Sequence, residues 1–152
     1  MTGGPQHGPW RVLVVEDDPL IASLVADGLR GFGHVARVCA DPVDAVEELN
    51  SFDPHVLVSD LNFPSGGSGA RLIAHVRHTH PWVAVVVLSN HRSPELAVAD
   101  SAELPPDVVY LVKSMVSSVN QLQDGVVAAM VGGGNPRHDI VLHAHDEILV
   151  SR

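Results

Sequence analysis

The sequence predicts an α/β fold in which one parallel sheet of five strands carries helices on both faces. Five short runs rich in valine and leucine alternate with segments whose apolar residues recur at helical spacing. Such runs are typical of strands buried on both faces of a parallel sheet. Because strand–helix–strand crossovers are right-handed, the alternation leads to a doubly wound sandwich of three layers. A chain of 152 residues accommodates one such domain.

The expected strands are the most continuous apolar stretches of the chain. The third run continues into Ser59 and Asp60, where it ends, and the fourth is the most apolar of the set. Short length and enrichment in valine favour strands over buried helices at these positions. In order, the runs are Val12–Val15, His34–Cys39, Val56–Val58, Val83–Leu88 and Val108–Val112.

The first two helices have clear start and stop signals. Pro19 suits the first turn of a helix, and Gly31 and Gly33 are expected to end it. The second helix is expected to start at Asp41-Pro42, with Asp41 as its cap. Both helices therefore lie between consecutive expected strands.

The later helices are less uniform. A Gly/Ser loop over residues 65–69 leads into a third helix. Residues 94–103 are weakly helical, and Pro105-Pro106 breaks them. The last helix is expected to carry apolar residues from Val116 to Met130 and to end at the glycines that follow.

The chain divides into three parts by composition. Residues 1–9 are rich in glycine and proline and are expected to be a flexible segment. Residues 10–132 form the domain. Residues 133–152 form a tail that is too short for a helix-turn-helix output domain.

Charge and hydropathy exclude several classes of function. The formal net charge is -9 and the chain has nine Lys and Arg residues, which argues against direct binding of nucleic acid. No apolar run reaches the roughly 20 residues that span a bilayer, so no membrane insertion is expected. The N-terminus lacks the pattern of a secretory signal, and the single cysteine, Cys39, fits a reducing compartment. We therefore expect a cytoplasmic protein.

Polar residues capable of phosphoryl chemistry stand at the expected strand ends. Asp17 and Asp18 follow the first strand, and Asp60 ends the third. In doubly wound folds the chemistry collects at the carboxyl ends of the strands, so these carboxylates should converge. Clustered carboxylates favour a hard divalent cation such as Mg²⁺ or Mn²⁺. Ser89 and Lys113, the only lysine, end the fourth and fifth strands and are suited to phosphoryl oxygens.

Four segments together resemble the response-regulator receiver domain of two-component signalling. They are VLVVEDDPL, VLVSDLNFPSGGSG, VVVLSNH and YLVKS, and they span about residues 11–131. The LSNH and LVKS segments are most similar to the subgroup that is usually fused to a helix-turn-helix output. The resemblance implies a flavodoxin-like (βα)5 fold with strand order 2-1-3-4-5.

The resemblance also implies a role for each strand-end residue. By position, Asp60 is similar to the phosphoacceptor, and Asp17 and Asp18 to the acidic metal pair. The resemblance further implies that the backbone carbonyl of Asn62 is a metal ligand. Ser89 and Lys113 are similar to the hydroxyl and the lysine that sense the phosphate, and Tyr110 is similar to the aromatic residue that reports phosphorylation.

Those roles imply a signalling module rather than an enzyme with a foreign substrate. A sensor histidine kinase or phosphotransfer protein would donate the phosphoryl group to Asp60. The signal would pass on through protein contacts of the face formed by residues 94–131. One such contact would be a homodimer formed through that face. His91, two positions after Ser89, would tune hydrolysis together with Asn62.

Two other functions fit part of the pattern. A small aspartyl-phosphate phosphatase would use Asp60 as nucleophile, but no cap domain or substrate pocket is suggested by the sequence. A degenerate receiver would act by binding without phosphorylation. The sequence also departs from the family: Ser114 follows Lys113 where proline is usual, and the loop after Asp60 is about one residue longer.

Overall fold

The computed structural model describes residues 9–63, 68–90 and 104–132, and its elements follow the predicted alternation. A short 3₁₀ helix, η2 (Lys113–Met115), precedes the last helix. The strands are β1 (Arg11–Val15), β2 (Val35–Cys39), β3 (Val56–Asp60), β4 (Ala84–Ser89) and β5 (Val109–Val112). The helical elements are α1 (Pro19–Gly31), α2 (Pro42–Phe52), α3 (Gly69–Thr79), η2 (Lys113–Met115) and α5 (Val119–Gly132).

The strands form one parallel sheet in the order β2-β1-β3-β4-β5, which confirms the predicted topology. β3 is the central strand, between β1 and β4. The sheet register places Val15 beside Ser59, and Asp60 beside Leu88. All five carboxyl ends therefore lie at one edge of the sheet, and that edge is where the site forms.

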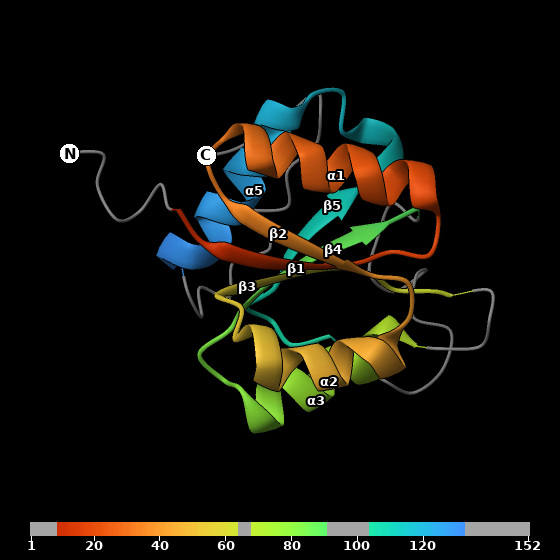
Figure 1. Cartoon of the computed structure of the whole chain (residues 1–152), viewed down its shortest axis with the longest axis vertical. Helices are drawn as coiled ribbons and strands as arrows, with labels where there is room; N and C mark the ends of the chain where they lie inside the picture. Colours follow the sequence, from red (N-terminus) through yellow and green to blue (C-terminus); the bar gives the residue numbers. More distant parts are fainter. Residues whose placement is uncertain (1–8, 64–67, 91–103, 133–152) are drawn as a thin grey trace.

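Helices cover both faces of the sheet, so the domain has three layers (Figure 1). α1 and α5 lie on one side, and α2 and α3 lie on the other. Two hydrophobic cores fill the spaces between the layers. The larger core contains Leu13, Leu57 and Ile73, and the second contains Val14, Val58 and Leu111; all six are nearly or fully buried. Burial of this apolar surface is the main source of stability.

Side-chain caps start three of the helices. Asp18, Asp41 and Ser68 accept hydrogen bonds from backbone N–H groups in the first turns of α1, α2 and α3. These bonds satisfy donors that have no partner inside the helix. The predicted cap at Asp41 is thus confirmed, and Gly33, with φ of 95°, follows the end of α1.

The last helix begins later than the sequence predicts. Val116 follows η2 in extended conformation, and α5 starts only at Val119. The Gln121 side chain accepts from the backbone N–H groups of Ser117 and Ser118, which stabilises the non-helical turn before α5. The expected weak helix over 94–103 and the tail over 133–152 lie outside the described residues.

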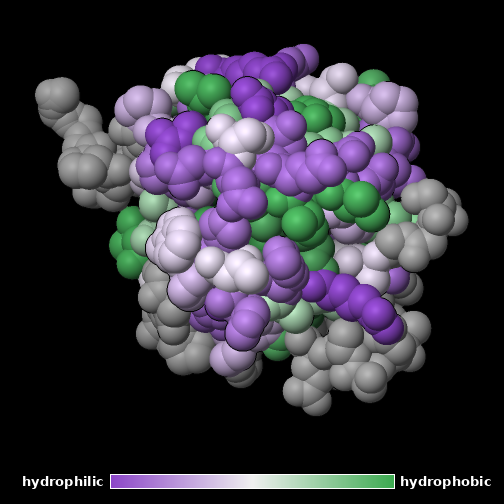
Figure 2. Space-filling model, turned by 60° about the horizontal axis from the view of Figure 1, so that its bottom comes forward, coloured by the Kyte–Doolittle hydropathy of each residue, from purple (hydrophilic) through white to green (hydrophobic). Residues whose placement is uncertain are grey.

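Hydrophilic side chains dominate the face drawn in Figure 2; its largest apolar area lies near the centre, and smaller ones lie towards the top and at the left edge. The largest exposed apolar side chains of the described part include Leu20, Leu24, Val43 and Trp82. Among the described residues, no helix has the length and apolar character needed to cross a membrane.

Candidate functional site

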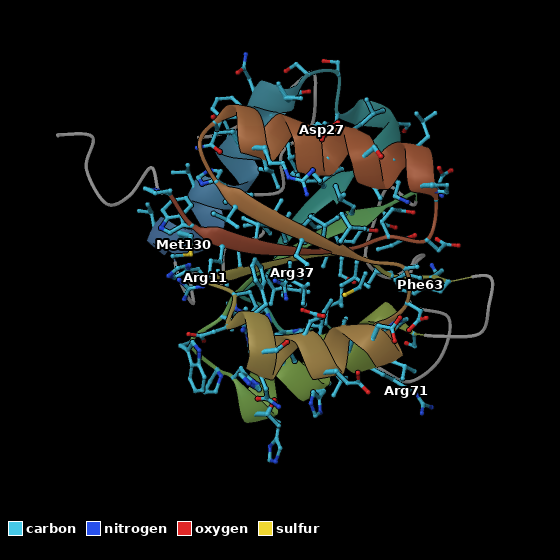
Figure 3. The ribbon with its side chains drawn as sticks, viewed as in Figure 1. Arg11, Asp27, Arg37, Phe63, Arg71 and Met130 are labelled. Atoms are coloured by element: carbon cyan, nitrogen blue, oxygen red, sulfur yellow. The ribbon has the colours of Figure 1, made fainter. Side chains whose placement is uncertain are left out.

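The site lies where β1, β3, β4 and β5 end. Figure 3 places Phe63, which follows β3, at the end of the molecule opposite Arg11, the first residue of β1. Because the strands are parallel, the residues that follow β1 and β5 reach the same end as Asp60. Parallel topology alone thus brings together residues that are far apart in the sequence.

Three carboxylates meet at this edge. Glu16, Asp17 and Asp60 each offer an oxygen, and these oxygens lie within 4.8 Å of one another. Glu16 and Asp60 are buried, and Asp17 is partly buried. Such a cluster of oxygen ligands suits a hard divalent cation, which would offset the mutual repulsion of the carboxylates.

Lys113 supplies the positive charge at the site. Its Nζ lies 2.8 Å from Glu16 Oε1 and 3.1 Å from Asp60 Oδ2. The side chains of Glu16 and Lys113 are only 2% and 13% exposed, so solvent screens this pair weakly. Three carboxylates face one ammonium, so with all of them ionised the group carries a net charge of -2.

The pKa values follow from this crowding. Burial raises the pKa of Glu16, and the opposing effect of Lys113 is too small to cancel it. Burial alone would lower the pKa of Lys113, but its bonds and charge interactions with Glu16 and Asp60 outweigh burial and raise the pKa. Lys113 is therefore held in its charged form, and Glu16 carries the charge that is costly to bury.

The Asp60 carboxylate has a defined orientation. Its Oδ1 accepts a 2.7 Å hydrogen bond from the backbone N–H of Leu61. Its Oδ2 accepts a 3.1 Å hydrogen bond from Lys113 Nζ. The two oxygens thus have different partners, one from the backbone and one from a cationic side chain.

The structure brings Asp17 and Asp60 together but leaves Asp18 outside the cluster. Asp18 Oδ1 accepts from the N–H groups of Leu20 (2.9 Å) and Ile21 (3.3 Å), so its side chain caps α1. Glu16 takes the inner position, and its Oε2 accepts from the Asp18 N–H at 3.1 Å. The sequence pattern alone did not indicate Glu16 as part of the site.

Two of the other predicted site residues, Ser89 and Asn62, lie at the same end of the sheet. Ser89 ends β4, is fully buried and is in register with Val112, the residue before Lys113. Tyr110 is 1% exposed and belongs to the larger core. Asn62 is exposed two residues beyond Asp60 and forms an isolated bridge with Ser68; its role as a metal ligand stays a prediction. His91 lies outside the described residues.

The fold and the strand-end carboxylates define a doubly wound α/β domain with an acidic site at the carboxyl edge of its sheet. The family model of the response regulator receiver domain matches residues 12–104, more than half of the chain. The chain therefore belongs to the response regulator receiver family, a family of signalling modules.

Curated relatives agree with this membership. Regulator of RpoS from Escherichia coli (strain K12) is 29% identical over 121 residues, which cover 79% of this chain and 34% of that protein. Nitrogen assimilation regulatory protein NtrX from Azorhizobium caulinodans is 34% identical over 89 residues, which cover 58% of this chain and 20% of that protein. The chain spans about a third or less of the length of these relatives.

Solved structures show the same fold. Chemotaxis response regulator CheY4 of Vibrio cholerae matches with a TM-score of 0.61 and 20% identity, over 82% of this chain and 97% of that chain. The isolated REC domain of RcsB from Salmonella enterica serovar Typhimurium matches with a TM-score of 0.64 and 22% identity, over 82% of this chain and 91% of that chain.

Proposed function

We propose that this receiver accepts a phosphoryl group on Asp60 and uses it to switch protein contacts. The observation that carries the proposal is the position of the Asp60 carboxylate. It is buried beside the carboxylates of Glu16 and Asp17 and accepts a hydrogen bond from the Lys113 ammonium. A carboxylate in that setting has both a place for a cation and a fixed positive charge for phosphoryl oxygens.

A divalent cation, Mg²⁺ or Mn²⁺, fits the donor set. Asp17, Asp60 and Glu16 would hold it, directly or through water, with the Asn62 carbonyl as a further ligand. Such a cation, when bound, offsets the charge of an incoming phosphoryl donor. The carboxylates and Lys113 leave a net charge of -2, which the charge of a divalent cation would neutralise.

The transfer requires a donor whose bond to phosphorus is weak. An Asp60 carboxylate oxygen attacks the phosphorus, and the bond to the donor nitrogen or oxygen breaks as the mixed anhydride forms. A phosphohistidine of a sensor histidine kinase or phosphotransfer protein is the expected donor. Lys113 donates to one phosphoryl oxygen, and the Ser89 hydroxyl to another. Attack of water on the phosphorus later breaks its bond to the Asp60 oxygen, which releases inorganic phosphate and returns the free carboxylate.

Output is proposed to use the face of residues 94–131, of which 104–131 are described. Tyr110, one of these residues, is fully buried in the larger core. When Ser89 and Lys113 bind the phosphoryl oxygens, the equilibrium between two arrangements of this face would shift. A homodimer formed through the face would shift with it. Amide exchange should then change in residues 89–115 on phosphorylation. Changes confined to the neighbourhood of Asp60 would contradict this switch.

Incubation with acetyl phosphate tests the acceptor. We expect one phosphoryl group per chain, formed only with Mg²⁺ or Mn²⁺, and acid-labile label that Asp60→Asn abolishes. Labelling of the Asp60→Asn variant at Asp17 would refute the assignment. Turnover of foreign phosphate esters would favour a phosphatase, and absence of label from the folded protein would favour a receiver that acts by binding alone.

A further inference from the structure

One buried residue beside the acceptor has a side chain that its surroundings do not favour. Ser59 is fully buried in β3, where its neighbours in the sheet are Val15 on β1 and Val87 on β4. Both neighbours belong to the larger apolar core. Packing alone would favour valine at this position, because a buried hydroxyl loses its bonds to water.

The hydroxyl of Ser59 bonds to the acceptor residue itself. Its Oγ donates a 2.7 Å hydrogen bond to the backbone carbonyl oxygen of Asp60. That carbonyl belongs to the peptide unit between Asp60 and Leu61. The N–H of the same unit donates to Asp60 Oδ1, also at 2.7 Å. Because a peptide unit is planar, a bond that fixes its carbonyl also fixes the direction of its N–H.

The same carbonyl has close packing from α3. A Cβ atom at Gly69, the first residue of α3, would lie 2.0 Å from the Asp60 carbonyl oxygen. The Gly69 N–H donates to the Leu61 carbonyl at 2.8 Å. The peptide unit after Asp60 is thus held by a hydroxyl from β3 and by the backbone of α3, with little room to rotate.

We propose that Ser59 is a positioning residue for phosphoryl acceptance. It fixes the Asp60–Leu61 peptide, whose N–H holds Oδ1 and so directs Oδ2 towards Lys113 and the cation site. Ser59 touches neither the phosphoryl group nor the cation and acts through the backbone of the acceptor. The inference rests on the proposed function, since it concerns the geometry of the same carboxylate.

Two nearly isosteric variants isolate the hydroxyl. Ser59→Val and Ser59→Thr both add a β-branched side chain suited to a strand, and only threonine retains the hydroxyl. Each is compared with the wild type for three properties: the rate of labelling by acetyl phosphate at saturating donor and Mg²⁺, the Kd for Mg²⁺, and the Tm.

For Ser59→Val we expect labelling to slow about tenfold, because misplacement of a reacting group is costly even when binding is intact. Its Mg²⁺ affinity should stay within about twofold of wild type, and its Tm should be equal or higher. Ser59→Thr should label within about threefold of wild type, or roughly 0.7 kcal/mol of barrier.

Three outcomes would overturn the inference. Wild-type rates for both variants would show that the hydroxyl has no positioning role. Equal slowing of both would assign the effect to packing. A slower Ser59→Val with a Tm that falls in proportion would make the role purely structural. Absence of label on folded wild-type protein would instead overturn the proposed function, and this inference with it.

Discussion

Substitution of Gly69 by alanine should disturb the acceptor as well as the fold. The added Cβ would lie 2.0 Å from the Asp60 carbonyl oxygen and 2.7 Å from Leu61 Cα. Real Cβ atoms stay beyond 3.0 Å, so the start of α3 and the end of β3 must separate by about 1 Å. Both partners are backbone, so no side chain can rotate away. Overpacking of this kind costs about 1–3 kcal/mol of stability.

The effect on phosphorylation should be at the upper end of the range expected for stability. A displacement of about 1 Å at a reacting group can slow a reaction on the order of a hundredfold, or roughly 2.7 kcal/mol of barrier. The assay is the rate of labelling by acetyl phosphate, with the Tm measured in parallel. Gly31→Ala is the matched control, because nothing lies within 4 Å of its added Cβ at the end of α1. Labelling of Gly69→Ala within about twofold of that control would refute the reasoning.

Three further predictions concern charged groups. Asp17→Asn should weaken Mg²⁺ binding and slow labelling, whereas Asp18→Ala should lower the free energy of unfolding by about 1 kcal/mol and leave Mg²⁺ titrations unchanged, since Asp18 caps α1. Arg77→Met should lower the free energy of unfolding, measured with denaturant, by about 1–3 kcal/mol, because Arg77 makes two hydrogen bonds to Asp107 and the two side chains are only 20% and 19% exposed. The control is Arg11→Met, which should lower it by less than about 1 kcal/mol, because the side chains of Arg11 and its partner Asp53 are 40% and 68% exposed. Burial and the charge of Arg11 lower the pKa of His55. The contribution of His55 to stability is therefore complete when the pH is above 6.5, its ordinary pKa, and is lost as the pH falls below that value. His55→Gln should flatten this part of a curve of Tm against pH, and an unchanged curve would contradict the assignment.

The fold could be predicted because each strand except the edge strand β2 is buried on both faces. Its sequence is then a nearly unbroken apolar run, as in Val56–Val58, and runs of that length alternate with helical segments. The start of α5 was predicted too early because Val116 fits the helical spacing, although the Gln121 side chain holds a non-helical turn there. Periodicity cannot reveal a side chain that competes for the backbone.

The site was predicted only in part because three acidic residues follow β1 in succession. Spacing alone does not say which of Glu16, Asp17 and Asp18 turn inwards. Pro19 was a usable signal: proline favours the first helical position, which makes the preceding residue the cap. Asp18 is then assigned to the helix, and Glu16 and Asp17 remain for the cluster. Ser59 gave no such signal, since its role depends on a bond that only the folded backbone creates.

If Asp60 is the acceptor, as proposed, the charges of the site link cation binding to phosphorylation. With its carboxylates ionised, Glu16, Asp17, Asp60 and Lys113 sum to -2, and an aspartyl phosphate in place of the Asp60 carboxylate brings the sum to about -3. The phosphorylated site should therefore hold a divalent cation more tightly than the free site. Linkage is reciprocal, so the cation stabilises the phosphorylated form by the same factor. Glu16 strengthens this coupling. When Lys113 turns from Glu16 to a phosphoryl oxygen, the buried Glu16 carboxylate loses its positive partner. An unpaired buried carboxylate is costly, so the divalent cation must supply the positive charge that replaces Lys113.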